Sequence, residues 1–138
     1  MKVSLKKIGN LGFEAHTGSG HTMKMDGSPD DGGQNLGLRP METVLCGLGG
    51  CSGIDVALIL EKARQKIDDC EIEIEAKRAD AVPAVFTDIH VHYRITGSDL
   101  DPKKVSRAVS LSMEKYCSVT RMLEPTVSIT HDFEIIAG

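Results

Sequence analysis

The cysteines are the side chains of this sequence whose type and spacing could do chemistry, and Cys51 is the first of them. It lies in the glycine-rich run Gly47-Leu48-Gly49-Gly50-Cys51-Ser52-Gly53. Each glycine inside a helix costs about 1 kcal/mol relative to alanine, so we expect another backbone or a small ligand to approach this segment closely. Two interpretations stay open. The local sequence favours tight helix packing with Cys51 as a small buried apolar group; the other interpretation is a reactive thiol.

Cys117 is the second candidate, and its position suits a secondary role. It follows a predicted helix in the segment Lys115-Tyr116-Cys117-Ser118-Val119. The C-terminus of a helix does not stabilise a thiolate, which disfavours Cys117 as the primary nucleophile. A thiol that resolves an intermediate needs less activation, so that role remains available to it, and at a helix end we expect it to be free to move.

The other two cysteines are expected to be structural. Cys46 lies five residues before Cys51, about 140° around a helix, so the two cannot form a local disulfide or chelate. Cys70 begins a predicted strand on its apolar face. The sequence has no CxxC motif and no pair of cysteines with the spacing of zinc ligands. Any cysteine chemistry must therefore be assembled by the fold from distant positions.

The histidines give a weaker signal. His90 and His92 share one face of a predicted strand and could together hold a metal ion. Arg94 lies on the same face and no carboxylate cluster is near in the sequence, so a solvated face is the favoured interpretation. The glycine-rich loop after residue 26 lacks the GK[ST] ending of a phosphate-binding loop.

One long helix must position Cys51. It is predicted to begin at Pro40, because proline is well tolerated in a first helical turn, and to run to about Lys66. Apolar residues occur on every side of its middle, and a helix that is apolar all round is expected to be buried.

Strands with alternating polarity are predicted on both sides of that helix, at residues 3–8, 11–16, 21–25, 70–76, 89–95 and 127–135. A second helix is predicted from about Pro102 to Tyr116, with an apolar stripe at helical spacing. The order β-β-β-α-β-β-α-β indicates an α+β fold with mainly antiparallel strand pairing, in a single domain over residues 1–138.

Composition limits the class of protein. The 138 residues include 16 Lys and Arg against 20 Asp and Glu, a formal net charge of −4, which argues against nucleic-acid binding. The longest uninterrupted apolar run has five residues (56–60), far short of a membrane span, and no signal segment follows the first residues. Four cysteines are too few for a disulfide-dense secreted scaffold. We therefore expect a cytoplasmic protein that does not bind a membrane.

The segment Pro40-Met41-Glu42-Thr43-Val44-Leu45-Cys46-Gly47-Leu48-Gly49-Gly50-Cys51-Ser52-Gly53-Ile54-Asp55-Val56 closely resembles the first-cysteine helix of the OsmC/Ohr family of organic hydroperoxide reductases. The segment around Cys117 resembles that family's second-cysteine motif. The predicted order of elements also matches the family over essentially the whole chain. The closest resemblance is to the branch with Pro-x-Glu and Gly-Gly-Cys.

This resemblance implies an intertwined homodimer with the two long helices at its centre. It also implies that Cys51 is the peroxidatic thiol and Cys117 the resolving thiol. Cys51 would reduce an organic hydroperoxide and become a sulfenic acid. Cys117 would then form a disulfide with it, and a lipoyl-type dithiol would restore both thiols. No metal, flavin or haem is required.

The sequence departs from the well-characterised enzymes at two places. Those enzymes hold the reactive thiolate with an arginine from the N-terminal strands, whereas here no arginine precedes Arg39. They carry a glutamate directly after the proline, whereas here Met41 takes that place and Glu42 follows it. Arg39 and Glu42 are therefore the candidates for the activating cation and carboxylate.

Two functions follow from these observations. The first is a thiol-dependent peroxidase for organic hydroperoxides, active in oxidative-stress defence, which the paired cysteines favour. The alternative is a non-enzymatic dimer of the same fold that binds a ligand or responds to redox conditions through its thiol pair, which the missing N-terminal arginine favours.

Overall fold

The structure is a computed structural model that describes residues 1–138. Contacts within the chain divide it into two compact units, Met1–Cys46 and Gly47–Gly138. The boundary falls within the long helix α1 (Pro40–Lys62), whose first turns belong to the first unit and whose remainder belongs to the second. Each unit has its own sheet, so the α+β fold class predicted from the sequence is confirmed. The single domain stays a prediction.

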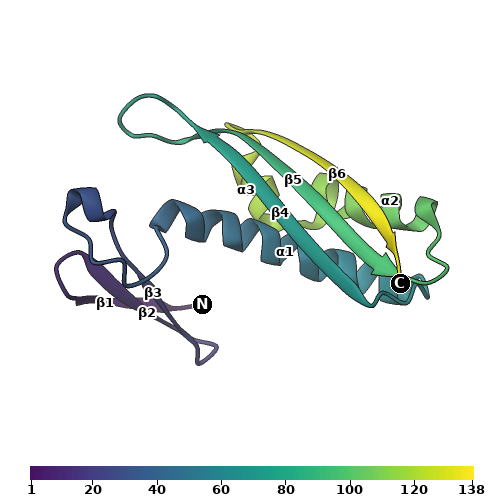
Figure 1. The fold of residues 1–138 in the computed structure, drawn as a ribbon, viewed down its shortest axis with the longest axis horizontal. Coiled ribbons are helices and arrows are strands. Elements are labelled where there is room, and N and C mark those ends of the chain that lie inside the picture. The colour runs from purple at the N-terminus through teal and green to yellow at the C-terminus, as the bar shows by residue number, and fades with distance from the viewer. The chain divides into compact units, whose positions relative to one another are not determined.

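The first unit is a three-stranded antiparallel sheet (Figure 1). Its strands are β1 (Val3–Ile8), β2 (Gly12–Thr17) and β3 (Thr22–Met25), each within one residue of the predicted bounds. A loop with a short 3-10 turn at Pro29–Asp31 follows. The buried Asp26 carboxylate organises this loop, since it accepts backbone N–H bonds from Gly27, Gln34 and Leu36 at 2.7 to 3.2 Å.

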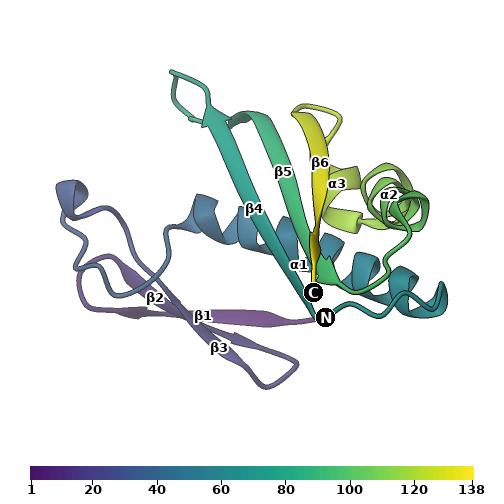
Figure 2. The same ribbon diagram turned by 45° about the vertical axis from the view of Figure 1, so that its right-hand side comes forward.

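The second unit is a sheet with helices on one of its faces (Figures 1 and 2). Its strands are β4 (Asp69–Arg78), β5 (Phe86–Gly97) and β6 (Ser128–Ala137), in the order β4-β5-β6. β4 pairs with β5 antiparallel, and β5 pairs with β6 parallel. The parallel pair requires a crossover, which α2 (Pro102–Leu111) and α3 (Ser118–Leu123) supply.

The core of the second unit lies between its sheet and its helices. Alternate residues of β5 face the helices, and the side chains that fill this layer are all less than 2% exposed: Leu48, Val56, Leu60, Ile89, Val91, Tyr93, Ile95, Val105, Ala108 and Val109. With few aromatic residues, the core is mostly aliphatic. The packing of this core therefore determines which side of α1 faces the crossover helices.

Helix α1 differs from its prediction in one important respect. It ends at Lys62 rather than near Lys66, and it is not buried all round. Its buried side chains form one narrow stripe of four residues, while Ile54 is 64% exposed and Leu58 is 49% exposed. Within the single chain, one sheet face covers only one side of the helix, and burial of the other side stays a prediction.

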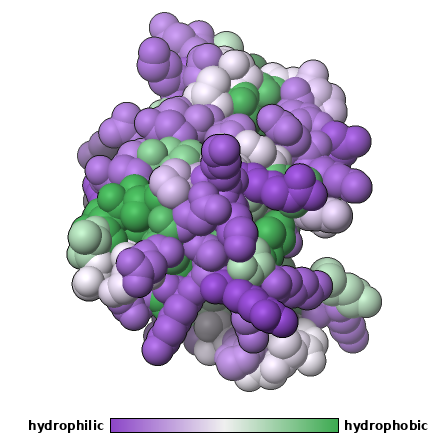
Figure 3. All heavy atoms as spheres, turned by 90° about the vertical axis from the view of Figure 1, so that its right-hand side faces the viewer, coloured by the Kyte–Doolittle hydropathy of each residue, from purple (hydrophilic) through white to green (hydrophobic).

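The uncovered side of α1 gives this helix an unusual surface. By length and mean hydropathy, 1.8 over an 18-residue window, α1 alone among the helices could cross a membrane. One such helix is weak evidence for that, since the core helix of a globular domain meets the same test. Exposed apolar patches commonly mark interaction sites. The face drawn in Figure 3 is mostly hydrophilic, and its apolar side chains gather in a few patches.

The second predicted helix is also different from its prediction. Instead of one helix over residues 102–116, α2 ends at Leu111 and a π-helical turn follows over Ser112–Tyr116. Cys117 leaves the helical conformation, with φ −69° and ψ 108°, before α3 begins at Ser118. The apolar stripe is compatible with either course of the chain, so its spacing does not reveal this break.

Candidate active site

Two of the four cysteines come together in the second unit. Cys51 is half-buried on α1, and Cys117 lies between the π-helical turn and α3. Their side chains interact, which contributes to raising the pKa of the Cys117 thiol. The pair predicted from the sequence is therefore adjacent, although 65 residues separate its members along the chain.

The Cys117 side chain is buried and is surrounded by polar groups. Its side chain is 1% exposed, and its Sγ lies 4.0 Å from the carbonyl oxygen of Leu48 on α1. Burial is the main reason why the pKa of this thiol is raised, and the neighbouring Cys51 thiol adds to the rise. The hydroxyl and backbone N–H of Thr120 form hydrogen bonds with Cys117 that oppose it. At neutral pH, this environment favours the neutral thiol.

Two expectations about Cys117 need correction. It was placed at a helix C-terminus, but it is also the residue that precedes the first turn of α3. Thr120 of that turn supplies the hydrogen bonds to its sulfur. It was also expected to be mobile, but it is almost completely buried. Both errors come from reading residues 102–116 as one continuous helix.

The glycines of α1 support close packing at two positions. A Cβ built on Gly53 would lie 2.9 Å from the end of the Ile72 side chain, and one on Gly49 would lie 3.1 Å from that of Ile74. These two glycines, one turn apart, let β4 approach the helix closely. Gly47 and Gly50 have open space where a side chain would be. The packing interpretation therefore accounts for two of the four glycines.

Arg39 and Glu42 lie in the first unit, at the beginning of α1. Glu42 accepts the backbone N–H of Arg39 through Oε1 at 2.8 Å, the arrangement by which the third residue of a helix satisfies the N-cap position. The Arg39 guanidinium donates to the carbonyl oxygen of Gly37 at 3.0 Å and to Asn35 Oδ1 at 3.2 Å. Both side chains thus have a structural role, and their roles in catalysis stay predictions.

Sequence reasoning missed the polar residues beside the thiols. Thr120 gave no signal, because the sequence predicts no helix or strand between Tyr116 and residue 127. Ser52, Tyr93 and Ser112 form a fully buried hydrogen-bonded group in the core. A hydroxyl on the apolar face of each of three predicted elements is the signal that could have revealed this group.

His90 and His92 lie on the opposite face of the sheet from the thiols. The parallel strand β6 places Asp132 between them, with Oδ1 2.9 Å from His90 Nε2 and 2.6 Å from His92 Nδ1. Glu134 is 3.3 Å from His92 Nε2. Strand pairing therefore brings carboxylates that are distant in the sequence beside the two histidines. No group of three or more metal-ligating side chains in the chain has a geometry suited to a metal ion.

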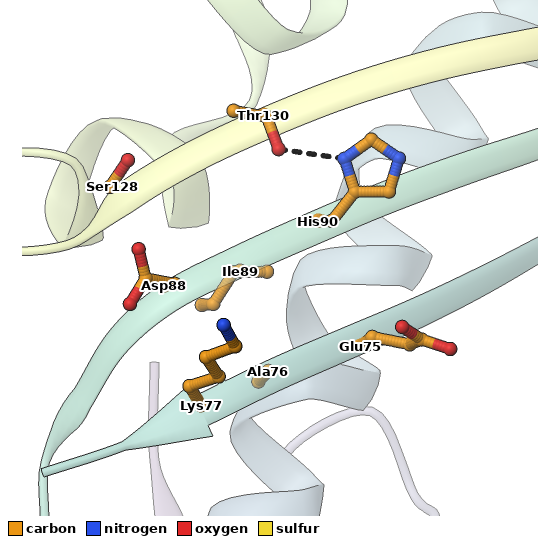
Figure 4. Close-up of a pocket in the computed structure, with 8 residues that line it drawn as sticks. All are labelled: Glu75, Ala76, Lys77, Asp88, Ile89, His90, Ser128 and Thr130. Atoms are coloured by element: carbon orange, nitrogen blue, oxygen red, sulfur yellow. Dashed lines mark hydrogen bonds between the residues drawn. The ribbon is translucent and has the colours of Figure 1, made fainter.

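A large hollow is on this same outer face (Figure 4). It has a volume of about 590 Å³ and crosses β4, β5 and β6. Glu75, Lys77 and Asp88 lie along it, and Thr130 is joined to His90 by a 2.7 Å hydrogen bond. Neither thiol of the cysteine pair lines this hollow, so its size does not make it the active site.

Comparison with known proteins gives the family. The family model described as "OsmC-like protein" matches residues 32–132. The chain is 45% identical over 138 residues to "Protein YhfA" of Escherichia coli (strain K12), with all of both chains covered.

Solved structures share the fold of this chain. A hypothetical protein from Aquifex aeolicus VF5 is 32% identical, with a TM-score of 0.87 over 99% of this chain and 96% of the other. The organic hydroperoxide resistance protein OhrB of Bacillus subtilis shares the fold at 20% identity, with a TM-score of 0.64 over 96% of each chain. The resemblance seen in the two cysteine motifs is confirmed, and the chain belongs to the OsmC-like protein family.

Proposed function

We propose that this protein is a thiol-dependent peroxidase that reduces organic hydroperoxides to alcohols in oxidative-stress defence in the cytoplasm. One observation carries the proposal: Cys51 and Cys117, which lie on separate elements, have interacting side chains. Family membership and the shared fold with an organic hydroperoxide resistance protein support a peroxide-related role.

The reaction needs only the two thiols and an external dithiol. The Cys51 thiolate attacks the terminal peroxide oxygen, the O–O bond breaks, and the departing alkoxide takes a proton and leaves as an alcohol. The sulfur becomes a sulfenic acid. The Cys117 sulfur then displaces the hydroxyl group, which leaves as water with the Cys117 proton, and a disulfide forms. A dithiol of the lipoyl type reduces this disulfide by two exchange steps.

The environments of the thiols favour Cys51 as the attacking group. Cys51 is half-buried, so a small substrate reaches its sulfur more easily than that of Cys117, which is 1% exposed. Burial also raises the pKa of Cys117 and keeps it protonated. A protonated thiol beside the sulfenic acid carries the proton that the departing hydroxyl group needs.

The activating groups for Cys51 are proposed to be Arg39 and Glu42. The Arg39 guanidinium donates to two neutral oxygens, and its charge also helps to lower the pKa of the buried Asp26 carboxyl. We propose that the same positive charge contributes to stabilising a Cys51 thiolate. We expect Arg39→Ala to slow the first step at least tenfold without changing which cysteines form the disulfide. Arg39→Lys, which keeps the charge, is the matched control.

We also propose a homodimer that uses the uncovered side of α1. Gly47, Gly50, Ile54 and Leu58 follow one another at helical spacing on exposed positions of this helix. The two glycines have open space around them and Ile54 is 64% exposed. A second copy of the helix would cover this stripe and complete the burial that the sequence predicts.

Turnover with a defined reductant tests the proposed activity. We expect steady consumption of cumene hydroperoxide with dihydrolipoamide as reductant, and slower consumption of hydrogen peroxide. Cys46→Ser is the control, because Cys46 is exposed and outside the pair, and it should keep the full rate. Absence of turnover with any organic hydroperoxide, in a folded protein whose thiols are reduced, would refute the peroxidase.

A redox-responsive thiol pair without turnover is the second candidate. The Glu42 carboxylate favours it, since its bond to the Arg39 N–H leaves it less free to assist catalysis. This candidate predicts that glutathione disulfide oxidises the Cys51–Cys117 pair while hydroperoxides are consumed only once per chain, at a slow rate.

A further inference from the structure

Three buried hydroxyls join the elements that carry the two thiols. Ser52 on α1, Tyr93 on β5 and Ser112 at the start of the π-helical turn are each 0% exposed. Ser52 Oγ forms hydrogen bonds with Tyr93 OH and, at 2.7 Å, with Ser112 Oγ. Ser112 Oγ donates to Asp55 Oδ2 at 3.0 Å. Buried hydroxyls without partners are strongly destabilising, so this group holds three elements in one arrangement.

The Asp55 carboxylate sets the direction of these hydrogen bonds. A hydroxyl donates one proton, and an ionised carboxylate only accepts. Because Ser112 donates to Asp55, Ser52 donates to Ser112 and Tyr93 donates to Ser52. Burial raises the pKa of Tyr93 to about 12, so its hydroxyl stays a donor at neutral pH. The order Tyr93, Ser52, Ser112, Asp55 uses every hydroxyl proton.

Ser112 also contacts Cys117 through a hydrogen bond between their main chains. The backbone N–H of Cys117 donates to the Ser112 carbonyl oxygen at 2.8 Å, which closes the π-helical turn. The Ser112 side chain therefore forms hydrogen bonds with α1, while its carbonyl oxygen accepts one from Cys117. Ser52, the hydrogen-bond partner of Ser112 on α1, directly follows Cys51 in the sequence.

The next residue provides a second connection. Met113 Sδ lies in contact with both hydroxyls, 3.6 Å from Ser52 Oγ and 3.7 Å from Thr120 Oγ1. Thr120 in turn forms hydrogen bonds with Cys117. The neighbours of both thiols therefore share one set of contacts. π-helical turns are rare and frequently occur at functional sites.

We propose that Ser112, held by Ser52, Tyr93 and Asp55, is a positioning residue that places the Cys117 sulfur for disulfide formation with Cys51. This inference rests on the proposed function for its catalytic meaning, because it concerns the second step of that reaction. It assigns to the hydroxyl group no contact with the peroxide. The geometric part of the proposal, that Ser112 keeps the two thiols close together, does not depend on which oxidant acts.

The first experiment measures geometry without any peroxide. The equilibrium between the thiol pair and its disulfide in a glutathione redox buffer gives the effective concentration of one thiol at the other. We expect Ser112→Ala to lower this effective concentration at least tenfold and Tyr93→Phe, which keeps the ring, at least threefold. Ser106→Ala removes an exposed hydroxyl from α2 and should leave it unchanged.

The second experiment separates the two steps after one equivalent of cumene hydroperoxide. In Ser112→Ala we expect disulfide formation to slow at least tenfold, sulfenic acid to accumulate and become trapped by dimedone, and the first step to change less than twofold. The pH midpoint of disulfide formation should stay in place, because Ser112 acts on position. A changed midpoint would indicate thiol activation and overturn the proposal.

The outcomes also distinguish this inference from the proposed function. If the wild-type protein forms no sulfenic acid, the peroxidase is refuted while the glutathione measurement still decides the positioning role. Wild-type effective concentrations in both Ser112→Ala and Tyr93→Phe would overturn the inference, as would an equal loss in Ser106→Ala. If Ser112→Ala does not fold, Tyr93→Phe alone decides the outcome.

Discussion

The backbone N–H of Cys117 reaches the carbonyl oxygen of Ser112 at 2.8 Å, across five residues rather than the four of an α-helix. This wide turn ends the helical conformation and places Cys117 beside Cys51 of α1. The cysteine pair is therefore a product of an irregularity in the crossover, and the roles of its members can be tested separately.

The order of the two thiols can be read from stoichiometry. We expect Cys51→Ser to abolish peroxide consumption, because the remaining thiol of the pair is buried and its pKa is raised. Cys117→Ser should consume about one equivalent per chain and stop at a sulfenic acid that dimedone traps. Peptide mapping of the oxidised wild type should show one Cys51–Cys117 disulfide. A single-equivalent burst in Cys51→Ser would place the nucleophile elsewhere.

Two substitutions of Glu42 distinguish its role in helix capping from a role in catalysis. Its carboxylate oxygen accepts the Arg39 N–H at the beginning of α1, so Glu42→Ala should lower the free energy of unfolding by about 1 kcal/mol. Glu42→Gln keeps an acceptor and should retain most of that stability. Chemical denaturation measures both. If Glu42→Gln is stable and nevertheless slows peroxide consumption, the negative charge itself contributes to the site, whereas an unchanged rate restricts Glu42 to capping.

The outer sheet face predicts a pH-dependent contribution to stability. Hydrogen bonds with Asp132, and then with Glu134, raise the pKa of His92, so its contribution is complete below its ordinary value of 6.5 and is lost as the pH rises through the raised pKa. The hydrogen bond with His92 lowers the pKa of Asp132. The Asp132 contribution is complete above 3.8 and is lost as the pH falls through the lowered pKa.

Both contributions are therefore complete between these two ordinary values. We expect Asp132→Asn to lower the thermal midpoint more at about pH 5.5 than at about pH 8.5. Glu61→Gln, an equal change of charge on α1, should show no such difference. Equal losses for Asp132→Asn at both pH values would contradict the assignment.

The dimer is tested at the most exposed apolar residue of α1. Placing a charge at Ile54 would bury that charge in the proposed interface, which is strongly unfavourable. We expect light scattering to give the mass of two chains for the wild type at micromolar concentration and of one chain for Ile54→Glu. Lys103→Glu on the exposed side of α2 is the control and should remain dimeric. A monomeric wild type would rule the dimer out.

The alternating strands were predictable because their two faces differ in solvent exposure. The pattern around Ile72 and Ile74 predicted β4, and the pattern around Val91 predicted β5, since each alternation records one buried face. Alternation does not record the direction of a neighbouring strand. The helix predicted between β5 and β6 is compatible with the parallel pairing that places Asp132 and Glu134 beside the histidines, but it does not show that these two strands are neighbours.

The sequence predicts which two cysteines form the site, but it does not predict how the elements around them pack. Cys51 and Cys117 were selected by their motifs, but their closeness depends on how α1 packs on the crossover. Ser112 fits the apolar stripe of one continuous helix equally well, so the wide turn was missed. The side of α1 around Ile54 was expected to be covered because hydropathy indicates the need for a partner without indicating which chain supplies it.

The wide turn at Ser112–Tyr116 contains one residue more than an α-helical turn would hold. Removal of one residue from this segment would allow ordinary α-helical geometry, in which each residue advances by about 100° around the axis. The register of everything downstream would then rotate by that angle. The position now held by Cys117 would face away from α1, so the number of residues between the crossover helix and this cysteine is as necessary to the thiol pair as the cysteine itself.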